Sequence, residues 1–157
     1  MNLSFLALGV GFSSGLRTFT APAVVCWAAH LGRLHLQGTP FSFMGSKAAL
    51  AIFTFMALFE YIYDLNPNVP SRTSPPSLIA RILSGAVCVA SLFVSATQSW
   101  MVGAMLGGIG AVIGAFAGYH ARKSLVQNLK VKDAMIAIPE DLIAIGLACL
   151  MVGRLSS

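Results

Sequence analysis

Charged residues are scarce in this chain, and their scarcity limits what the protein can be. Asp, Glu, Lys and Arg make up only 10% of the 157 residues, whereas 57% are hydrophobic. Soluble domains carry about 25% charged residues, so a water-soluble fold of this size would lack polar surface. The mean hydropathy of +0.81 agrees. The composition therefore predicts an integral membrane protein, built as a single domain over residues 1–157.

Cysteine is rare too, and it carries no metal or redox pattern. Cys26, Cys88 and Cys149 lie in apolar runs without a CxxC or Cys/His spacing, so we expect small buried hydrophobic side chains. The P-loop, GxSxG and HExxH motifs are also missing. These absences predict no cofactor and favour a protein that is not an enzyme.

The net charge of +5 raises the question of nucleic acid as a partner. The basic residues lie mostly between apolar stretches, where contact with the headgroups of a lipid bilayer accounts for them. No basic patch is interleaved with aromatic residues, as nucleic-acid binders require. We therefore expect the bilayer as a partner, and no nucleic acid.

Five long apolar stretches predict an all-α, polytopic transmembrane bundle of about five spans. The first stretch contains Gly9-Val-Gly-Phe-Ser-Ser-Gly-Leu-Arg-Thr, which would permit a broken or re-entrant helix. Ser77 is a good N-cap for the third stretch, and a basic amphipathic link follows the fourth. The stretches cover residues 3–31, 48–63, 78–95, 100–119 and 134–153, and the link covers residues 120–133.

Lys and Arg are unevenly divided between alternate connections of a five-span chain. The side that holds the amino terminus carries six basic residues: Arg72, Arg81, Arg122, Lys123, Lys130 and Lys132. The other side carries three: Arg33, Lys47 and Arg154. Because cytoplasmic loops are rich in Lys and Arg, this count predicts the amino terminus inside and the carboxyl terminus outside. A re-entrant first stretch would change the assignment.

The charges within or beside the spans gather toward one end of the predicted bundle. A charge at the bilayer centre costs roughly 2.5–3.5 kcal/mol. Acids and bases at similar depth therefore predict a binding site for a small ion, an anionic small molecule or a lipid. The candidate residues are Arg17, Glu60, Asp64, Arg72, Arg81, Arg122, Glu140 and Asp141.

Each charged group has a functional and a structural interpretation. Glu60 and Asp64 are spaced i, i+4 and can share a helix face, where they would accept a proton, bind a cation or hold a metal. Alternatively, they bond an arginine at the helix end. Arg17 follows Gly15 and would bind an anionic group, or it forms a structural bridge to Glu60 or Glu140.

Proline and glycine leave two further alternatives open. Pro139 lies inside the last span, where it frees a backbone carbonyl, or it begins that span with Glu140 and Asp141 as N-terminal charges. A small-xxx-small series in the fourth span indicates close helix packing, either within the bundle or at a homodimer seam. The series consists of Gly103, Gly107, Gly110, Gly114 and Gly118.

Several motifs occur in order along most of the chain. They are Gly15-Leu-Arg17-Thr-Phe, Glu60-Tyr-Ile-Tyr-Asp64, Pro-Ser-Arg72-Thr-Ser-Pro-Pro, Leu78-Ile-Ala-Arg81, Gly114-Ala-Phe-Ala-Gly118-Tyr-His-Ala-Arg122 and Glu140-Asp141-Leu-Ile-Ala-Ile-Gly146. Together they resemble the DUF4126 family of small bacterial inner-membrane proteins. The resemblance implies the membrane class and the choice of site residues, and it implies no activity.

Three functions are compatible with these features of the sequence. The favoured one is a small transporter or channel-like protein, in which Glu60 and Glu140 handle protons or cations. Arg17, Arg81 and Arg122 would then hold an anionic group or neutralise the acids. Five helices enclose little volume, so we expect a homo-oligomer. The alternatives are a membrane enzyme or lipid-phosphate handler with a divalent cation on its carboxylates, and a structural or assembly protein.

Overall fold

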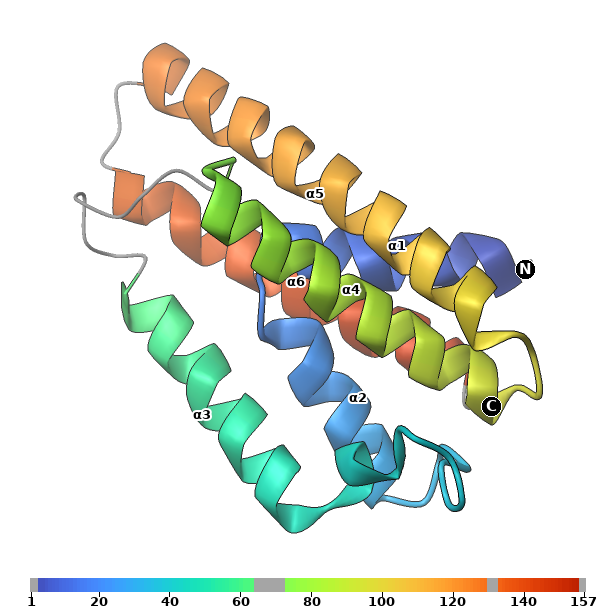
Figure 1. Cartoon of the computed structure of the whole chain (residues 1–157). Coiled ribbons are helices and arrows are strands. Elements are labelled where there is room, and N and C mark those ends of the chain that lie inside the picture. Colours follow the sequence, from blue (N-terminus) through green and yellow to red (C-terminus); the bar gives the residue numbers. More distant parts are fainter. Residues whose placement is uncertain (1–2, 64–72, 130–132, 156–157) are drawn as a thin grey trace.

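The computed structural model of the chain describes residues 3–63, 73–129 and 133–155, and these residues form an all-α fold (Figure 1). The predicted fold class is thus confirmed at this level. In chain order, the elements are α1 (Leu3–Leu16), α2 (Thr20–His30), the 3-10 helix η1 (Ser42–Gly45), α3 (Lys47–Tyr63), α4 (Pro75–Ser95), α5 (Trp100–Leu129) and α6 (Asp133–Leu155).

The first apolar stretch is broken into two helices that form a hairpin. α1 ends at Leu16 and α2 begins at Thr20; residues 17–19 between them are called the helix break below. α2 runs back from the break toward the end of the bundle where α1 began (Figure 1). The backbone N–H of His35, after α2, donates to Ser95 Oγ at the end of α4 (2.9 Å). The hairpin of α1 and α2 thus begins and finishes at the same end of the bundle.

This hairpin changes the expected number of spans. At about 1.5 Å per residue, the 14-residue α1 and the 11-residue α2 are each shorter than a bilayer core. Among the described residues, α4 and residues 100–127 of α5 are long and apolar enough to cross a membrane, and α1 is a shorter apolar helix. The structure does not confirm five continuous spans.

Three other boundaries differ from the prediction or decide between alternatives. α4 begins at Pro75 with Ser74 as its N-cap residue, because proline is tolerated in the first turn, where its missing N–H costs nothing. α5 continues to Leu129, so the predicted link is largely helical. Pro139 lies inside α6, and the interpretation that it begins the last helix is wrong.

α1, α4 and α5 pack closely because glycines line their contacts. A Cβ atom added to Gly11 would lie 2.5 Å from the carbonyl oxygen of Gly107, and one added to Gly85 would lie 2.6 Å from the same oxygen. Larger residues would push the helices apart. Packing within the bundle is therefore confirmed for Gly103, Gly107, Gly110 and Gly114, each of which faces α1 or α4 at such distances.

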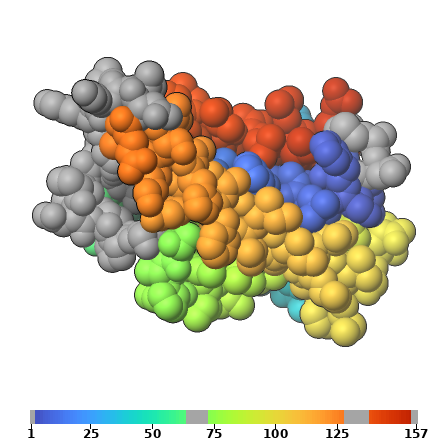
Figure 2. Space-filling model, turned by 90° about the horizontal axis from the view of Figure 1, so that it is seen from above, coloured from blue at the N-terminus to red at the C-terminus, as the bar shows by residue number. Residues whose placement is uncertain are grey.

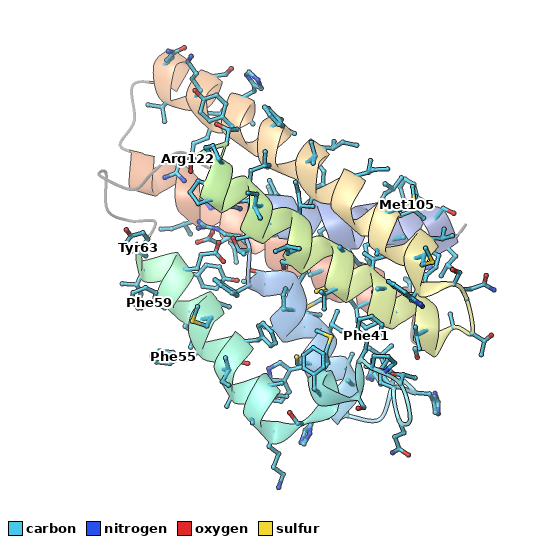
Figure 3. The ribbon with its side chains drawn as sticks, viewed as in Figure 1. Phe41, Phe55, Phe59, Tyr63, Met105 and Arg122 are labelled. Atoms are coloured by element: carbon cyan, nitrogen blue, oxygen red, sulfur yellow. The ribbon has the colours of Figure 1, made fainter. Side chains whose placement is uncertain are left out.

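α3 lies apart from this tight group, with α2 between it and the remaining helices (Figure 1). Only Ala49 and Ala57 of α3 are buried. Its outward face carries Phe55, Phe59 and Tyr63, which point away from the bundle (Figure 3). Seen from above, α1 lies between α5 and α6 (Figure 2). Side chains from α3, α4 and α6 reach the helix break.

Candidate functional site

Four charged residues meet around the helix break, and we call them the charged layer. Arg17 lies in the break itself, Glu60 on α3, Arg81 on α4 and Asp141 on α6. Arg17 has no exposed surface, and Arg81 is also buried. Since a buried charge without a partner costs several kcal/mol, these groups require each other.

Glu60 accepts hydrogen bonds from two backbone amides of the helix break. The backbone N–H of Thr18 donates to Glu60 Oε1 at 2.8 Å, and the N–H of Phe19 donates to Oε2 at 3.0 Å. These amides precede the first turn of α2, where the helix dipole favours a negative charge. The carboxylate thus caps α2 from a different helix.

Arg81 donates hydrogen bonds to two backbone carbonyl oxygens at the end of α1, just before the same break. Its Nη1 donates to the carbonyl oxygens of Gly15 and Leu16 at 2.8 and 2.7 Å. Its Nε donates to Ser77 Oγ at 3.2 Å, and Nη2 lies 3.7 Å from Glu60 Oε1. The guanidinium therefore neutralises the carboxyl end of α1 and touches the carboxylate that caps α2.

Arg17 and Asp141 form the second ion pair of the layer. Arg17 Nη2 contacts Asp141 Oδ1, with 0% of the arginine and 17% of the aspartate side chain exposed. The guanidinium carbon of Arg17 also lies 5.6 Å from the centre of the Tyr61 ring, a distance at which a cation is attracted by an aromatic face. Asp141 is thus the more accessible member of the pair.

Hydroxyl groups form further hydrogen bonds around the break. Ser84 Oγ donates to the carbonyl oxygen of Thr18 at 2.5 Å, and the hydroxyls of Thr20 and Tyr61 share a hydrogen bond of 2.7 Å. Ser13 Oγ donates to the carbonyl oxygen of Ala144 on α6 at 2.8 Å. Ser14 Oγ is fully buried and has no hydrogen-bond partner. None of these hydroxyl groups was predicted as a site residue from the sequence.

The structure brings together half of the predicted site residues. Arg17, Glu60, Arg81 and Asp141 form the charged layer, whereas Asp64 and Arg72 lie outside the described residues. Glu140 and Arg122 are half-buried and have interaction partners. Figure 3 places Arg122 on α5 toward the end where α4 and α6 begin.

Glu60 lies beside Arg81, as expected from its structural interpretation as the partner of an arginine at the helix end. Arg17 contacts Asp141, a partner that was not expected for it. Within the described parts of the chain, no three His, Cys, Asp or Glu side chains gather as a metal site. A hollow of about 730 Å³ lies elsewhere, lined by residues of the α2–η1 segment such as His30, His35 and Ser42.

Fold and site together define a class of protein: a helical bundle organised around a broken helix whose two ends are capped by buried charges of opposite sign. The chain belongs to the family described as a domain of unknown function (DUF4126), which matches residues 5–153. The predicted family is thereby confirmed. No curated protein and no solved structure matches the chain.

Proposed function

We propose that this chain is a multi-pass protein of the bacterial inner membrane, in which α3 to α6 cross the bilayer. The supporting observation is the apolar surface. Large hydrophobic side chains are exposed along all four helices, such as Phe55, Met105 and Leu142 at 69%, 68% and 67%. Soluble monomers seldom expose contiguous patches above a few hundred Å². Phe55 and Met105 both point outward in Figure 3.

The lengths of the helices fit this arrangement. The 21 residues of α4 rise by about 31 Å, which matches a bilayer core of about 30 Å. The hairpin of α1 and α2 would enter the bilayer and return, as a re-entrant element. Protein groups bond two amides and three carbonyl oxygens of its backbone at the break, and such bonds are the condition for irregular structure at membrane depth.

The re-entrant hairpin alters the predicted orientation. One end of the bundle still carries six basic residues and the other end carries three. The positive-inside rule therefore places the end where α4 begins in the cytoplasm. With four crossings after a hairpin, Leu3 and Leu155 then lie on the outer side together. The expectation that the amino terminus lies inside is therefore replaced.

The function that the site supports best is the movement of a small ion through the charged layer. The observation that carries this proposal is the helix break, with charges of both signs around it. Residue Arg81 lies six positions into α4, about 9 Å from its start. Transporters place binding sites at broken helices because half-helix ends supply partial charges at membrane depth.

The four charges of the layer have different roles in this proposal. Glu60 holds two backbone amides and Arg81 holds two carbonyl oxygens, so this pair keeps the break in shape. Asp141 binds a side chain, Arg17, and is partly exposed. Arg17 and Asp141 are therefore the groups that meet the moving ion.

A flux assay with the full chain in vesicles tests the proposal. Asp141→Asn and Arg17→Gln are expected to lower ion flux at least tenfold while the protein still folds. The matched control is Ser91→Ala, which removes a buried hydroxyl bound only to the Cys88 carbonyl of its own helix. Normal flux in both layer variants, or no flux of any ion in the wild type, would contradict the proposal.

A structural or assembly protein is the second candidate, because the charges of the layer satisfy one another and the helix break. In that case Arg17→Gln lowers stability and produces no separate defect in flux. The third candidate, an enzyme with a divalent cation, gains no support from the described residues. The homo-oligomer stays a prediction that native mass spectrometry of the purified protein would test by counting copies.

A further inference from the structure

We propose that the hollow beside the α2–η1 segment is a binding site for an anionic phosphate ester, such as the headgroup of an anionic phospholipid. The hollow measures about 730 Å³ and is lined by residues between Ala29 and Ser46, a size typical of small-molecule sites. The inference goes beyond ion movement and does not depend on it. Only the choice of a lipid as the source of the phosphate rests on the proposed membrane location.

The loop that forms the hollow is long and is held in shape by its own hydrogen bonds. Residues 31–46 connect α2 to α3, and loops longer than about 12–15 residues are uncommon and often functional. Thr39 Oγ1 donates to the Leu36 carbonyl oxygen at 2.7 Å and accepts from the Phe41 N–H at 3.3 Å. Leu34 and Leu36 line the hollow and belong to the hydrophobic core. A hollow formed in advance costs a ligand little ordering.

His30 and His35 fix two walls of the hollow. The Nδ1 atom of His30 lies 3.3 Å from the carbonyl oxygen of Gly45, which also lines the hollow. Because a carbonyl oxygen only accepts, this nitrogen carries the hydrogen. The backbone N–H of His35 donates to Ser95 Oγ on α4. The hollow is thus attached to α2, η1 and α4 together.

The polar side chains around the hollow can donate hydrogen bonds, and none of them is acidic. They are His30, His35, Gln37, Ser42 and Ser46. The chain contains no Asp or Glu before Glu60, whereas Arg33 and Lys47 each directly follow a lining residue. A cation would find no carboxylate among the described lining residues. A phosphate would find donors and neighbouring positive charge, which form its strongest hydrogen bonds.

These donors can reach a ligand at little cost. His35, Gln37 and Ser42 are exposed, so they can turn toward a phosphate without leaving a buried partner unpaired. Ser46 Oγ accepts a hydrogen bond from the Ala49 N–H at 3.1 Å. That bond does not use the hydroxyl hydrogen of Ser46, which is left to donate.

The helix ends beside the hollow are compatible with an anion. α2 presents its carboxyl end, whose partial negative charge would oppose one. However, the Gly32 N–H donates to the Ala29 carbonyl oxygen at 3.1 Å, and the Arg33 N–H donates to that of Ala28 at 2.9 Å. The positive φ of 74° at Gly32 permits this turn. α3 begins at Lys47, and its amino end favours a negative charge.

Aromatic side chains indicate that the hollow lies at the level of the lipid headgroups. Trp27 on α2 and Phe43 in η1 are each 47% exposed, and Trp100 at the start of α5 is 54% exposed. Tryptophan is enriched where a bilayer meets water. The α2–η1 segment lies at the end of the bundle where α4 finishes (Figure 1), which is the outer side in the proposed topology. The phosphate of an outer-leaflet lipid lies at this level.

Calorimetric titration of the full chain in a nonionic detergent tests the site. The titrants are dihexanoyl phosphatidylglycerol, dihexanoyl phosphatidylcholine and glycerol 3-phosphate. We expect phosphatidylglycerol to bind, and phosphatidylcholine to bind at least about tenfold more weakly because its headgroup has no net charge. Glycerol 3-phosphate carries the ester without acyl chains. Tighter binding of the lipid identifies a headgroup as the source of the phosphate, and tighter binding of glycerol 3-phosphate identifies a soluble ester.

Two matched double variants locate the binding. Gln37→Ala with Ser42→Ala removes two donors of the hollow, so the apparent Kd for phosphatidylglycerol is expected to rise at least about tenfold. Gln98→Ala with Ser99→Ala removes the same two side chains from exposed positions between α4 and α5 that do not line the hollow. There the Kd should change by less than about twofold. Unfolding temperatures check that both proteins fold, and His35→Ala replaces the first variant if it does not.

The outcomes separate this inference from the proposed function. No binding of either phosphatidylglycerol or glycerol 3-phosphate would overturn it. So would equal affinity for phosphatidylglycerol and phosphatidylcholine, or an equal loss of affinity in the two double variants. Ion flux in the wild type tests the proposed function separately, because neither result depends on the other.

Discussion

At the scale of single residues, the molecule uses buried charge to hold an interrupted backbone. Glu60 and Arg81 lie on different helices, yet each binds two backbone groups of the same break. Hydrogen bonds to a charged group contribute about 1.5–3 kcal/mol each. The cost of placing these charges in the interior is thereby offset by backbone groups that would otherwise be unpaired.

Replacing Glu60 by glutamine is expected to destabilise the fold by about 3 kcal/mol. The amide keeps one acceptor oxygen, but its NH₂ group opposes the second backbone N–H and Arg81 loses its negative partner. Thermal unfolding of the detergent-solubilised protein measures this change. Thr54→Ala is the control, since it removes an exposed hydrogen bond to Trp27 and is expected to cost under about 1 kcal/mol. Equal unfolding temperatures for the two variants would refute the capping role.

The identity of the charged layer was predictable to a large extent, whereas its pairing was not. Arg17, Glu60, Arg81 and Asp141 are conspicuous because charge is costly in apolar surroundings. Which base meets which acid depends on how the helices pack, and that information is distributed along the chain. The hydroxyls of Ser84 and Tyr61 could not be singled out, because such groups cost little in a helix and are common there.

At the scale of helices, small residues decide how closely the central elements approach. α1 and α5 contact each other through Gly11, Gly15, Gly107 and Gly114, and α4 joins them at Gly85. The glycine spacing in residues 103–118 indicated such contacts in advance. The sequence indicated a possible break within residues 9–18 but not its exact position at residues 17–19, because Gly-Leu-Arg-Thr is compatible with a continuous helix until Glu60 and Arg81 bind its backbone.

Two glycine-to-alanine substitutions provide a matched pair. In Gly114→Ala the new Cβ would overlap the Phe12 carbonyl oxygen, whereas at Gly146 nothing lies within 4 Å. We expect Gly114→Ala to destabilise by about 1–3 kcal/mol through overpacking. Gly146→Ala should be neutral or stabilise by up to about 1 kcal/mol, since alanine favours the helix. Unfolding temperatures measured side by side check both values. Equal effects at the two positions would argue against tight α1–α5 packing.

At the scale of the whole molecule, the fold combines a tight centre with an apolar exterior. α1 packs against α4, α5 and α6, while α3 contacts mainly α2 and η1 and exposes most of its surface (Figure 1). The composition predicted the apolar exterior, because ten basic and five acidic residues cannot cover a soluble domain of 157 residues. Whether the first apolar stretch crosses the bilayer or turns back was left open, because the length of an apolar stretch does not fix the direction in which the chain runs.

The central feature of the proposed topology is the hairpin of α1 and α2, which enters and leaves by one side of the membrane. It is tested by labelling single cysteines in intact cells with a membrane-impermeant maleimide. The positions are Ser4→Cys near the start of α1, Gln98→Cys between α4 and α5, and Lys123→Cys near the end of α5, in a Cys149→Ser background because Cys149 is exposed. We predict that positions 4 and 98 react from outside while position 123 does not. If position 4 is protected like position 123, the first stretch crosses the membrane and the re-entrant hairpin is wrong.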